Sequence, residues 1–139
     1  MGPAEDLFIA ALKAREKAHA PYSDFAVGVA IRTASGAIHT GANMENASYP
    51  EGWCAETTAI GHMLMAAIRP EDRRIAEVAV VADHVPPITP CGGCRQRLRE
   101  FSAPETLVHA CNLDGPQASF TMSELLPAAF ELPLPGDDA

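Results

Sequence analysis

The sequence predicts one α/β domain in which helices pack against a central sheet. Segments with helical spacing of apolar residues alternate with short strand-like runs, which is typical of a layered α/β domain. One run, residues 78–82, is continuously apolar, as expected of a strand covered on both faces. At 139 residues with 47% hydrophobic residues, the chain can build one core but not two ordinary ones. We therefore expect a single domain over residues 1–139.

The first half of the chain predicts a helix, a β-hairpin and a long loop. Residues 3–19 place apolar side chains on one helical stripe, and Pro21 follows as a helix breaker. Residues 25–31 alternate and are rich in β-formers, and residues 34–41 supply a turn and the returning strand. The polar residues that follow, 43–53, predict a loop.

The second half predicts three helices and two strands. Residues 54–68 are mostly apolar at helical spacing, so we expect a central helix there. The apolar strand comes next, and a second helix, residues 91–101, begins directly after a proline. Residues 107–111 predict another strand. A terminal helix is expected over residues 123–130, capped by Ser123.

The acidic composition argues against one class of partner. Ten Lys and Arg against 18 Asp and Glu give a net charge of -8, the wrong sign for gripping a phosphate backbone. A small neutral molecule would not feel this repulsion. No apolar stretch approaches the roughly 18 residues of a membrane span, and the N-terminal residues lack a secretory pattern. We expect a soluble, cytoplasmic protein with neither nucleic acid nor membrane as a partner.

Cysteine spacing is the strongest functional signal in the chain. Without an export signal, four cysteines are more typical of metal ligands or buried thiols than of disulfides. Cys91 and Cys94 share a helix face, so both thiolates can reach one tetrahedral zinc ion. Cys54 and Glu56 add a third thiolate and a carboxylate at the start of the other helix. The free N–H groups at both helix N-termini favour ionised thiols.

Three zinc ligands with a nearby carboxylate indicate a catalytic site. A zinc ion held by three protein groups keeps one position for water and lowers the pKa of that water to about 7. Glu56 can accept the proton of this water and return it to a leaving group. The hypothesis is therefore a catalytic zinc site formed by Cys54, Cys91, Cys94 and Glu56.

Two other interpretations of the cysteines stay open. A redox C-x-x-C would need a thioredoxin-like context, which the flanking sequence does not supply. A closed structural site would use Cys111 as the fourth ligand, but a cysteine in an apolar strand is more typically a packed thiol. No histidine lies in a ligand motif, and ordinary roles are expected for His19, His39, His62, His84 and His109.

The order of the motifs resembles one protein family. Cys54-Ala55-Glu56 followed by Pro90-Cys91-x-x-Cys94 resembles the zinc nucleoside and nucleobase deaminases. The similarity is greatest to the small homotetrameric cytidine deaminases and runs nearly the full chain. The other matching segments are Ala20-Pro21-Tyr22-Ser23, Phe25-x-Val27-Gly28, Gly41-x-Asn43-x-Glu45-Asn46, Cys94-Arg95-Gln96 and Glu124-Leu125-Leu126-Pro127-x-x-Phe130.

This resemblance implies a fold and a reaction. The fold would be a three-layer α/β/α arrangement, with a mixed five-stranded sheet and helices on both faces. The reaction would be hydrolytic deamination of cytidine and 2′-deoxycytidine to uridine and 2′-deoxyuridine with release of ammonia, a step of pyrimidine salvage. Glu56 would carry the protons, and a homotetramer would hold one Zn²⁺ per subunit.

The resemblance also implies a nucleoside pocket. Asn43 and Glu45 would bind the ribose hydroxyls, and an amide and a carboxylate can both accept from a diol. Taken alone, these two residues also fit a solvated loop. The further substrate contacts that it implies are packing by Phe25, main-chain hydrogen bonds at Ala47 and Ala55, shaping by Tyr49, and Phe130 from a neighbouring subunit. Without the resemblance, Phe25 fits ordinary strand core and Phe130 a hydrophobic helix end.

One position departs from the family. Relatives with three cysteine ligands usually carry Arg directly after the glutamate, and this chain has Thr57. Zinc with three thiolates carries a net charge of about -1, which makes its water a weaker acid. We expect Arg95 and the two helix N-termini to compensate this charge.

Two rival functions follow from the same residues. The first is a related deaminase of another aminopyrimidine nucleoside, such as a blasticidin-S-type compound, for which Thr57 and Trp53 are candidate adaptations. The second is a zinc-stabilised binding protein without catalytic activity.

Overall fold

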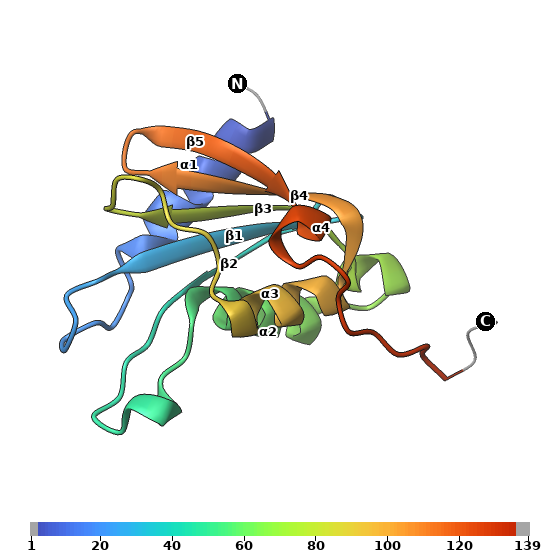
Figure 1. Cartoon of the computed structure of the whole chain (residues 1–139), viewed down its shortest axis with the longest axis horizontal. Coiled ribbons are helices and arrows are strands. Elements are labelled where there is room, and N and C mark those ends of the chain that lie inside the picture. The colour runs from blue at the N-terminus through green and yellow to red at the C-terminus, as the bar shows by residue number, and fades with distance from the viewer. Residues whose placement is uncertain (1–2, 136–139) are drawn as a thin grey trace.

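The computed structural model describes residues 3–135 of the chain (Figure 1). The longest α-helix has 13 residues, and no helix in this described part is both long and apolar enough to cross a bilayer. In chain order the elements are α1 (Pro3–Arg15), β1 (Val27–Thr33), β2 (Ile38–Ala42), η1 (Tyr49–Glu51), α2 (Ala55–Ala66), η2 (Pro70–Arg73), β3 (Ile75–Ala82), α3 (Gly92–Glu100), β4 (Ser102–Asn112), β5 (Gly115–Thr121) and α4 (Met122–Leu125).

The five strands form one mixed sheet in the order β2-β1-β3-β4-β5. The pair β3 and β4 is parallel and is connected through α3, whereas the other three pairs are antiparallel. Parallel neighbours need such a crossover, because the chain must return to the same end of the sheet before it pairs again. The mixed five-stranded sheet implied by the resemblance is confirmed.

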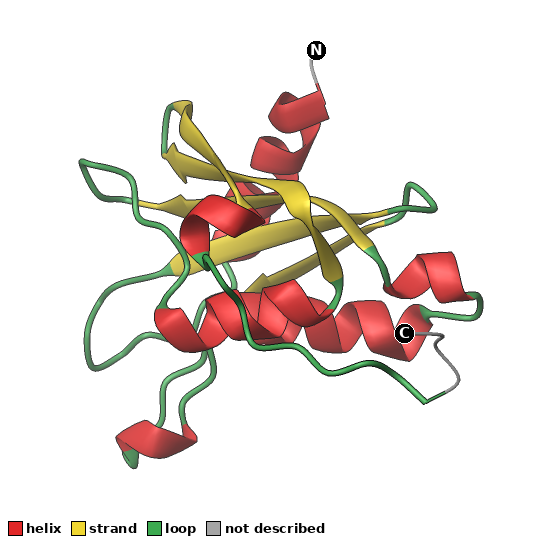
Figure 2. Cartoon of the chain, turned by 45° about the vertical axis from the view of Figure 1, so that its right-hand side comes forward, coloured by secondary structure: helices red, strands yellow, loops and turns green. Residues whose placement is uncertain are grey.

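Helices cover both faces of this sheet (Figures 1 and 2). On one face α1 packs Leu7 and Ala11 against alternate residues of β1, β3 and β4. On the other face α2 and α3 bury Met63 and Leu98 against the opposite set of strand side chains. The central strand β3 is buried on both sides from Val78 to its end, as its unbroken apolar run predicts. The three-layer α/β/α architecture is therefore confirmed.

Two glycines allow the helices to approach the sheet closely. A Cβ at Gly28 would lie 2.0 Å from the main-chain O of Ala11 in α1. A Cβ at Gly41 would lie 2.4 Å from the O of Ala55 and 2.5 Å from the N of Ala59 in α2. Such distances are far inside van der Waals contact, so only glycine fits at these positions. The first turn of α2 is thereby held directly against β2.

The first helix is shorter than its periodicity predicts. It ends at Arg15 rather than at residue 19, and the next three residues bond to carbonyls only three residues back. His19 then pairs with another part of the chain: its N donates to Asn43 O at 2.9 Å, and its O accepts from Glu45 N at 2.8 Å. Tertiary pairing ends the helix before Pro21 is reached.

The C-terminal helix also differs from its prediction. It starts one residue before Ser123 and is capped instead by Thr121, whose hydroxyl accepts from Glu124 N at 3.1 Å. The Glu124 carboxylate in turn accepts from Thr121 N at 2.9 Å. The helix lasts about one turn, because Leu126 precedes Pro127 and is excluded from the helical region.

The edge strand β5 has no clear signal in the sequence. It begins with Gly115 and Pro116, which are poor strand formers, and most of its residues are half-buried or exposed. The strand forms because its main chain pairs with β4, for example Val108 with Phe120. Strand β4 begins at Ser102, earlier than the predicted strand, where Ser102 pairs with Ile75 of β3.

A polar network crosses the α1 face of the sheet. Arg32 contacts Asp6 of α1 at 2.6 Å and Glu77 at 3.6 Å. His109 bridges Glu77 at 2.5 Å and the hydroxyl of Ser119 at 2.6 Å. His109 thus has a structural role, joining β3 to β5.

Replacing Gly41 by alanine tests the contact between β2 and α2. We expect Gly41→Ala to lower the free energy of unfolding by about 1 to 3 kcal/mol, because the new methyl group meets main-chain atoms that can move only together with the helix. Gly61→Ala, inside α2 with no atom within 4 Å of the new Cβ, is the control. It should raise the stability by roughly 0.5 to 1 kcal/mol. Urea unfolding followed by circular dichroism measures both, and equal effects would contradict the packing described.

Candidate metal centre

Three thiols meet where α2 and α3 begin. Cys54 is the N-cap residue of α2, Cys91 is the N-cap of α3, and Cys94 lies in the first turn of α3. Their Sγ atoms all lie within 4.8 Å of one another. Between residues 3 and 135 this is the one cluster of three potential metal ligands. The structure brings together the three cysteines that the sequence predicts as ligands.

The helix starts leave these thiols available for a metal. Cys54 and Cys91 have extended backbone angles, φ -76° and -67°, as N-cap residues do. Neither side chain makes a capping hydrogen bond to its own helix. The sulfur atoms can therefore turn toward one another, while the first-turn N–H groups of each helix favour negative charge there.

The electrostatics of the cluster call for a cation. Burial, followed by repulsion from Glu56 and the other two sulfurs, raises the pKa of Cys94 far above its usual range. Burial also raises the pKa of Cys54. Burial acts in the same direction on Cys91, but hydrogen bonds from Cys94 and Cys54 outweigh it and leave its pKa lowered. Three thiolates coexist here only with a metal, and a set of sulfur donors suits zinc.

Glu56 lies in the first turn of α2, two residues after Cys54. Its side chain is buried, with 5% of the residue exposed. Burial raises the pKa of its carboxyl, against smaller lowering effects from its own main chain and from the charge of Arg97. A buried carboxyl with a raised pKa is suited to take up a proton and release it again.

Cys111 and the histidines lie outside the cluster. Cys111 packs under α1, on the face of the sheet opposite α2, and burial raises the pKa of its thiol to about 11. His62 Nδ1 lies 2.7 Å from the carbonyl O of Thr40. Neither residue belongs to the metal-ligating group, so a closed four-thiolate site with Cys111 is not supported.

Asn43 and Glu45 hold the loops around β1. Asn43 Oδ1 accepts from Val27 N and its Nδ2 donates to Phe25 O, each at 2.9 Å. Glu45 accepts from Tyr22 N at 2.9 Å and from both the N and the hydroxyl of Ser23. The Ser23 hydroxyl is also the main reason why the pKa of Glu45 is lowered. Glu45 is therefore an ionised acceptor at the loop surface.

A surface hollow adjoins Glu45. It has a volume of about 340 Å³ and is lined by Tyr22, Ser23, Glu45, Asn46, Tyr49 and Gly52. The thiols do not line it. The loop behind it is closed by paired hydrogen bonds between Met44 and Trp53, 2.8 Å and 2.7 Å long, directly before Cys54.

The other residues expected in the pocket differ in how deeply they are buried. Phe25 is half-buried and meets His84 edge to face, with ring centroids 6.3 Å apart. Ala55 is buried beside Glu56, whereas Ala47 and Tyr49 are exposed on the loop before α2. Phe130 is 68% exposed, and its carbonyl accepts from Gln96 of α3. Within one chain these side chains do not form an enclosed pocket.

Arg95 does not contact the thiols, contrary to the expectation from sequence. Its Nε donates to Pro90 O at 2.7 Å, and its two terminal nitrogens donate to Leu125 O and Thr89 Oγ1 at 2.8 Å each. The guanidinium is thus committed to oxygen acceptors and joins α3 to α4.

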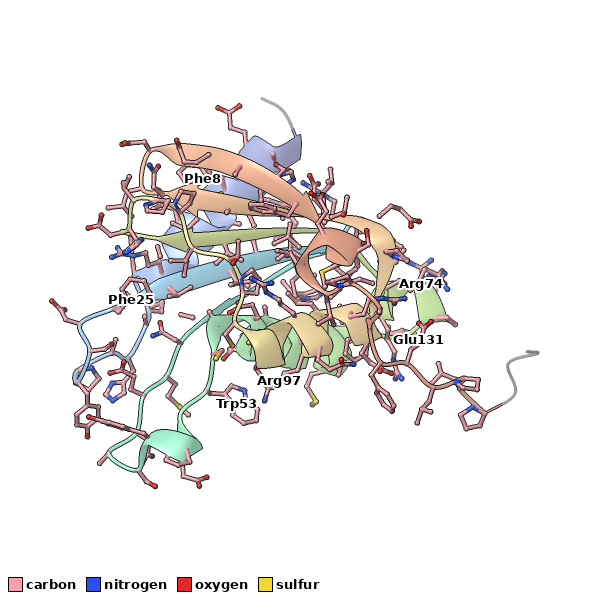
Figure 3. All side chains as sticks on the ribbon, viewed as in Figure 1. Phe8, Phe25, Trp53, Arg74, Arg97 and Glu131 are labelled. Carbon is pink, nitrogen blue, oxygen red and sulfur yellow. The ribbon has the colours of Figure 1, made fainter. Side chains whose placement is uncertain are left out.

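Arg97 is the arginine that reaches the cluster. Its Nη1 lies 3.8 Å from Cys94 Sγ, and Thr57 Oγ1 lies 3.9 Å from the same sulfur. Figure 3 shows Arg97 extending from α3 on the side of Trp53. Sequence reasoning missed Arg97, although its spacing of three residues from Cys94 on a helix is the signal that could have found it.

Comparison with known proteins identifies the family. Residues 1–110 match the family model described as "Cytidine and deoxycytidylate deaminase zinc-binding region". The chain belongs to this family. Among curated proteins it is 46% identical over 120 residues to a cytidine deaminase of Halalkalibacterium halodurans, covering 86% of this chain and 88% of that protein. It is 41% identical over 126 residues to one of Sporosarcina psychrophila, with coverages of 91% and 90%.

Solved structures agree with this assignment. The crystal structure of cytidine deaminase from Burkholderia pseudomallei superposes with a TM-score of 0.84 and 44% identity, covering 94% of this chain and all of that one. Together with the three-cysteine cluster, the zinc-binding region of the family supports zinc as the cofactor.

Single cysteine substitutions test the ligand set. We expect Cys54→Ser, Cys91→Ser and Cys94→Ser each to lose most of the bound zinc, because each removes one of three ligands. Cys111→Ala should keep the full metal content and lose only about 1 kcal/mol of stability from packing. Metal analysis by mass spectrometry after dialysis checks this, and loss of zinc in the Cys111 variant would contradict the assignment.

Proposed function

We propose that this protein is a zinc-dependent hydrolase that converts cytidine and 2′-deoxycytidine to uridine and 2′-deoxyuridine with release of ammonia. The observation that carries the proposal is the buried carboxyl of Glu56 beside a cluster of three thiols. The relatives described above, named cytidine deaminases at 41% and 46% identity, favour cytidine over a blasticidin-type substrate.

Glu56 is the proposed proton carrier. A zinc ion bound by Cys54, Cys91 and Cys94 supplies a Lewis acid that makes water nucleophilic near neutral pH. Glu56 removes a proton from the water that attacks C4 of the base and delivers it to N3. It then passes the second water proton to the departing amino group, so that water and cytidine give uridine and ammonia. The raised pKa of Glu56 suits a group that must both accept and return protons.

The ribose would be bound at the loops before β1 and α2. Glu45 is held ionised at this surface and retains lone pairs for a sugar hydroxyl, and the amide of Asn43 lies two residues away. Phe25 and Tyr49 supply aromatic surfaces nearby. We assign main-chain hydrogen bonds with the nucleoside to Ala47, in the loop before α2, and to Ala55, the first residue of α2.

A homotetramer with one zinc per subunit would complete this pocket. Large apolar side chains are left exposed in the single chain, and such surface is typical of an interface. The most exposed among the described residues are Ile68 (91%), Met65 (88%), Val85 (82%), Tyr49 (74%), Leu132 (72%) and Phe130 (68%). In the proposed assembly Phe130 reaches the active site of a neighbouring subunit. A cytoplasmic role in pyrimidine salvage, acting on nucleosides and not on nucleic acid, fits this reaction.

Removing the proton carrier tests the mechanism. We expect Glu56→Gln to keep its zinc but to lower kcat by about 10²- to 10⁴-fold, because an amide cannot accept a proton from water and return it to the substrate. Glu100→Gln, the same change at an exposed position at the end of α3, is the control and should stay fully active. Ammonia release and zinc content are measured on the same samples.

The substrate is tested with a panel on the parent protein. Cytidine and 2′-deoxycytidine should release ammonia, whereas cytosine and cytidine monophosphate should not. Preference for a blasticidin-type nucleoside would favour the first rival function. A zinc-loaded protein that is inactive on every compound would indicate the non-catalytic one.

Phe130 provides the test of a shared pocket. We expect Phe130→Ala to raise KM for cytidine about 10- to 100-fold, as for the loss of an aromatic contact worth roughly 1.5 to 3 kcal/mol. Leu132→Ala, at an equally exposed neighbour, should leave KM within about twofold. Sedimentation analysis of both variants separates pocket effects from assembly. An unchanged KM in an intact tetramer would rule out the role of Phe130.

A further inference from the structure

We propose that Arg97, assisted by Thr57, is a positioning residue that offsets the negative charge of the three-thiolate zinc site. The inference rests on the zinc site of the proposed function and names the group that replaces the expected Arg95. It concerns how this chain balances charge at a site where the residue after Glu56 is Thr57.

The charge problem is concentrated on Cys94. Zinc with three thiolates is about -1 before any further anion is counted, and Glu56 adds another acidic group close by. Cys94 is 0% exposed, so water cannot stabilise its sulfur. Donors that reach this atom therefore contribute most to keeping the complex stable.

Two helices each direct one donor at the same sulfur. Arg97 Nη1 approaches Cys94 Sγ from α3 at 3.8 Å, within the range of an N–H···S hydrogen bond. Thr57 Oγ1 approaches it from α2 at 3.9 Å. Arg97 alone brings a full positive charge, so it is the main contributor and the Thr57 hydroxyl is secondary.

The fold keeps Arg97 in this position. Its guanidinium turns back along α3 toward the N-terminus, where Nη1 lies 3.4 Å from the place that a Cβ of Gly93 would occupy. The guanidinium therefore lies within van der Waals reach of the first turn of α3. The neighbouring arginines of α3 are committed elsewhere: Arg95 to three oxygen atoms, and Arg99 to Glu131 and the carbonyl of Ser102.

Zinc affinity of charge variants tests the proposal. Arg97→Ala should weaken zinc binding about tenfold, as measured by competition with a chelator. This loss is at the low end of the range for residues that hydrogen-bond to a metal ligand, because Arg97 is exposed and its charge is partly screened by water. Arg97→Lys, which keeps the charge, should stay within about threefold of the parent. The double change Thr57→Arg with Arg97→Ala should recover affinity, since residue 57 points at the same sulfur.

The control removes the same charge far from the thiols. Arg73→Ala, in η2, changes an exposed arginine outside the cluster and should leave zinc affinity unchanged. Arg97→Ala should also lower kcat with a nearly constant KM for cytidine, whereas Arg97→Lys and Arg73→Ala should not. Parent-like affinity of Arg97→Ala, or an equal loss in Arg97→Lys or Arg73→Ala, would overturn the proposal. Because zinc binding is measured without turnover, a parent that binds zinc but releases no ammonia would refute only the proposed function.

Discussion

The close packing of α2 on the sheet at Gly41 fixes where the chemistry can occur. Because the main chain of Ala55 lies against β2, the start of α2 has one position, and Cys54 and Glu56 lie there. The parallel pairing of β3 and β4 requires α3 as a crossover, and its N-terminus therefore lies where β3 ends. Two unrelated constraints of the fold thus bring both helix starts to one place.

The residues that local spacing controls could be predicted from the sequence. Periodicity predicts the buried strand β3, and periodicity together with Pro90 predicts that two helices begin near Cys54 and Cys91. The metal cluster follows from the positions of these two helix N-termini. Tertiary pairing decided the features that were missed. Hydrogen bonds of His19 end α1 early, and β5 exists only through its partner strand.

The error over Arg95 shows the limit of sequence distance as a guide. Arg95 directly follows Cys94, but neighbours on a helix point about 100° apart, whereas Arg97 at i+3 lies on the same face. The pocket residues could be named only through the family resemblance. Glu45 and Tyr49 line one hollow, whereas Phe130 is exposed beside α3 and does not line that hollow.

In the proposed site, a zinc ion would have three sulfur ligands and one position left for water. X-ray absorption spectroscopy at the zinc edge of the loaded protein measures this directly. We expect three sulfur atoms at about 2.3 Å and one oxygen at about 2.0 Å. A shell of four sulfur atoms would leave no position for water and would contradict a catalytic role for the metal.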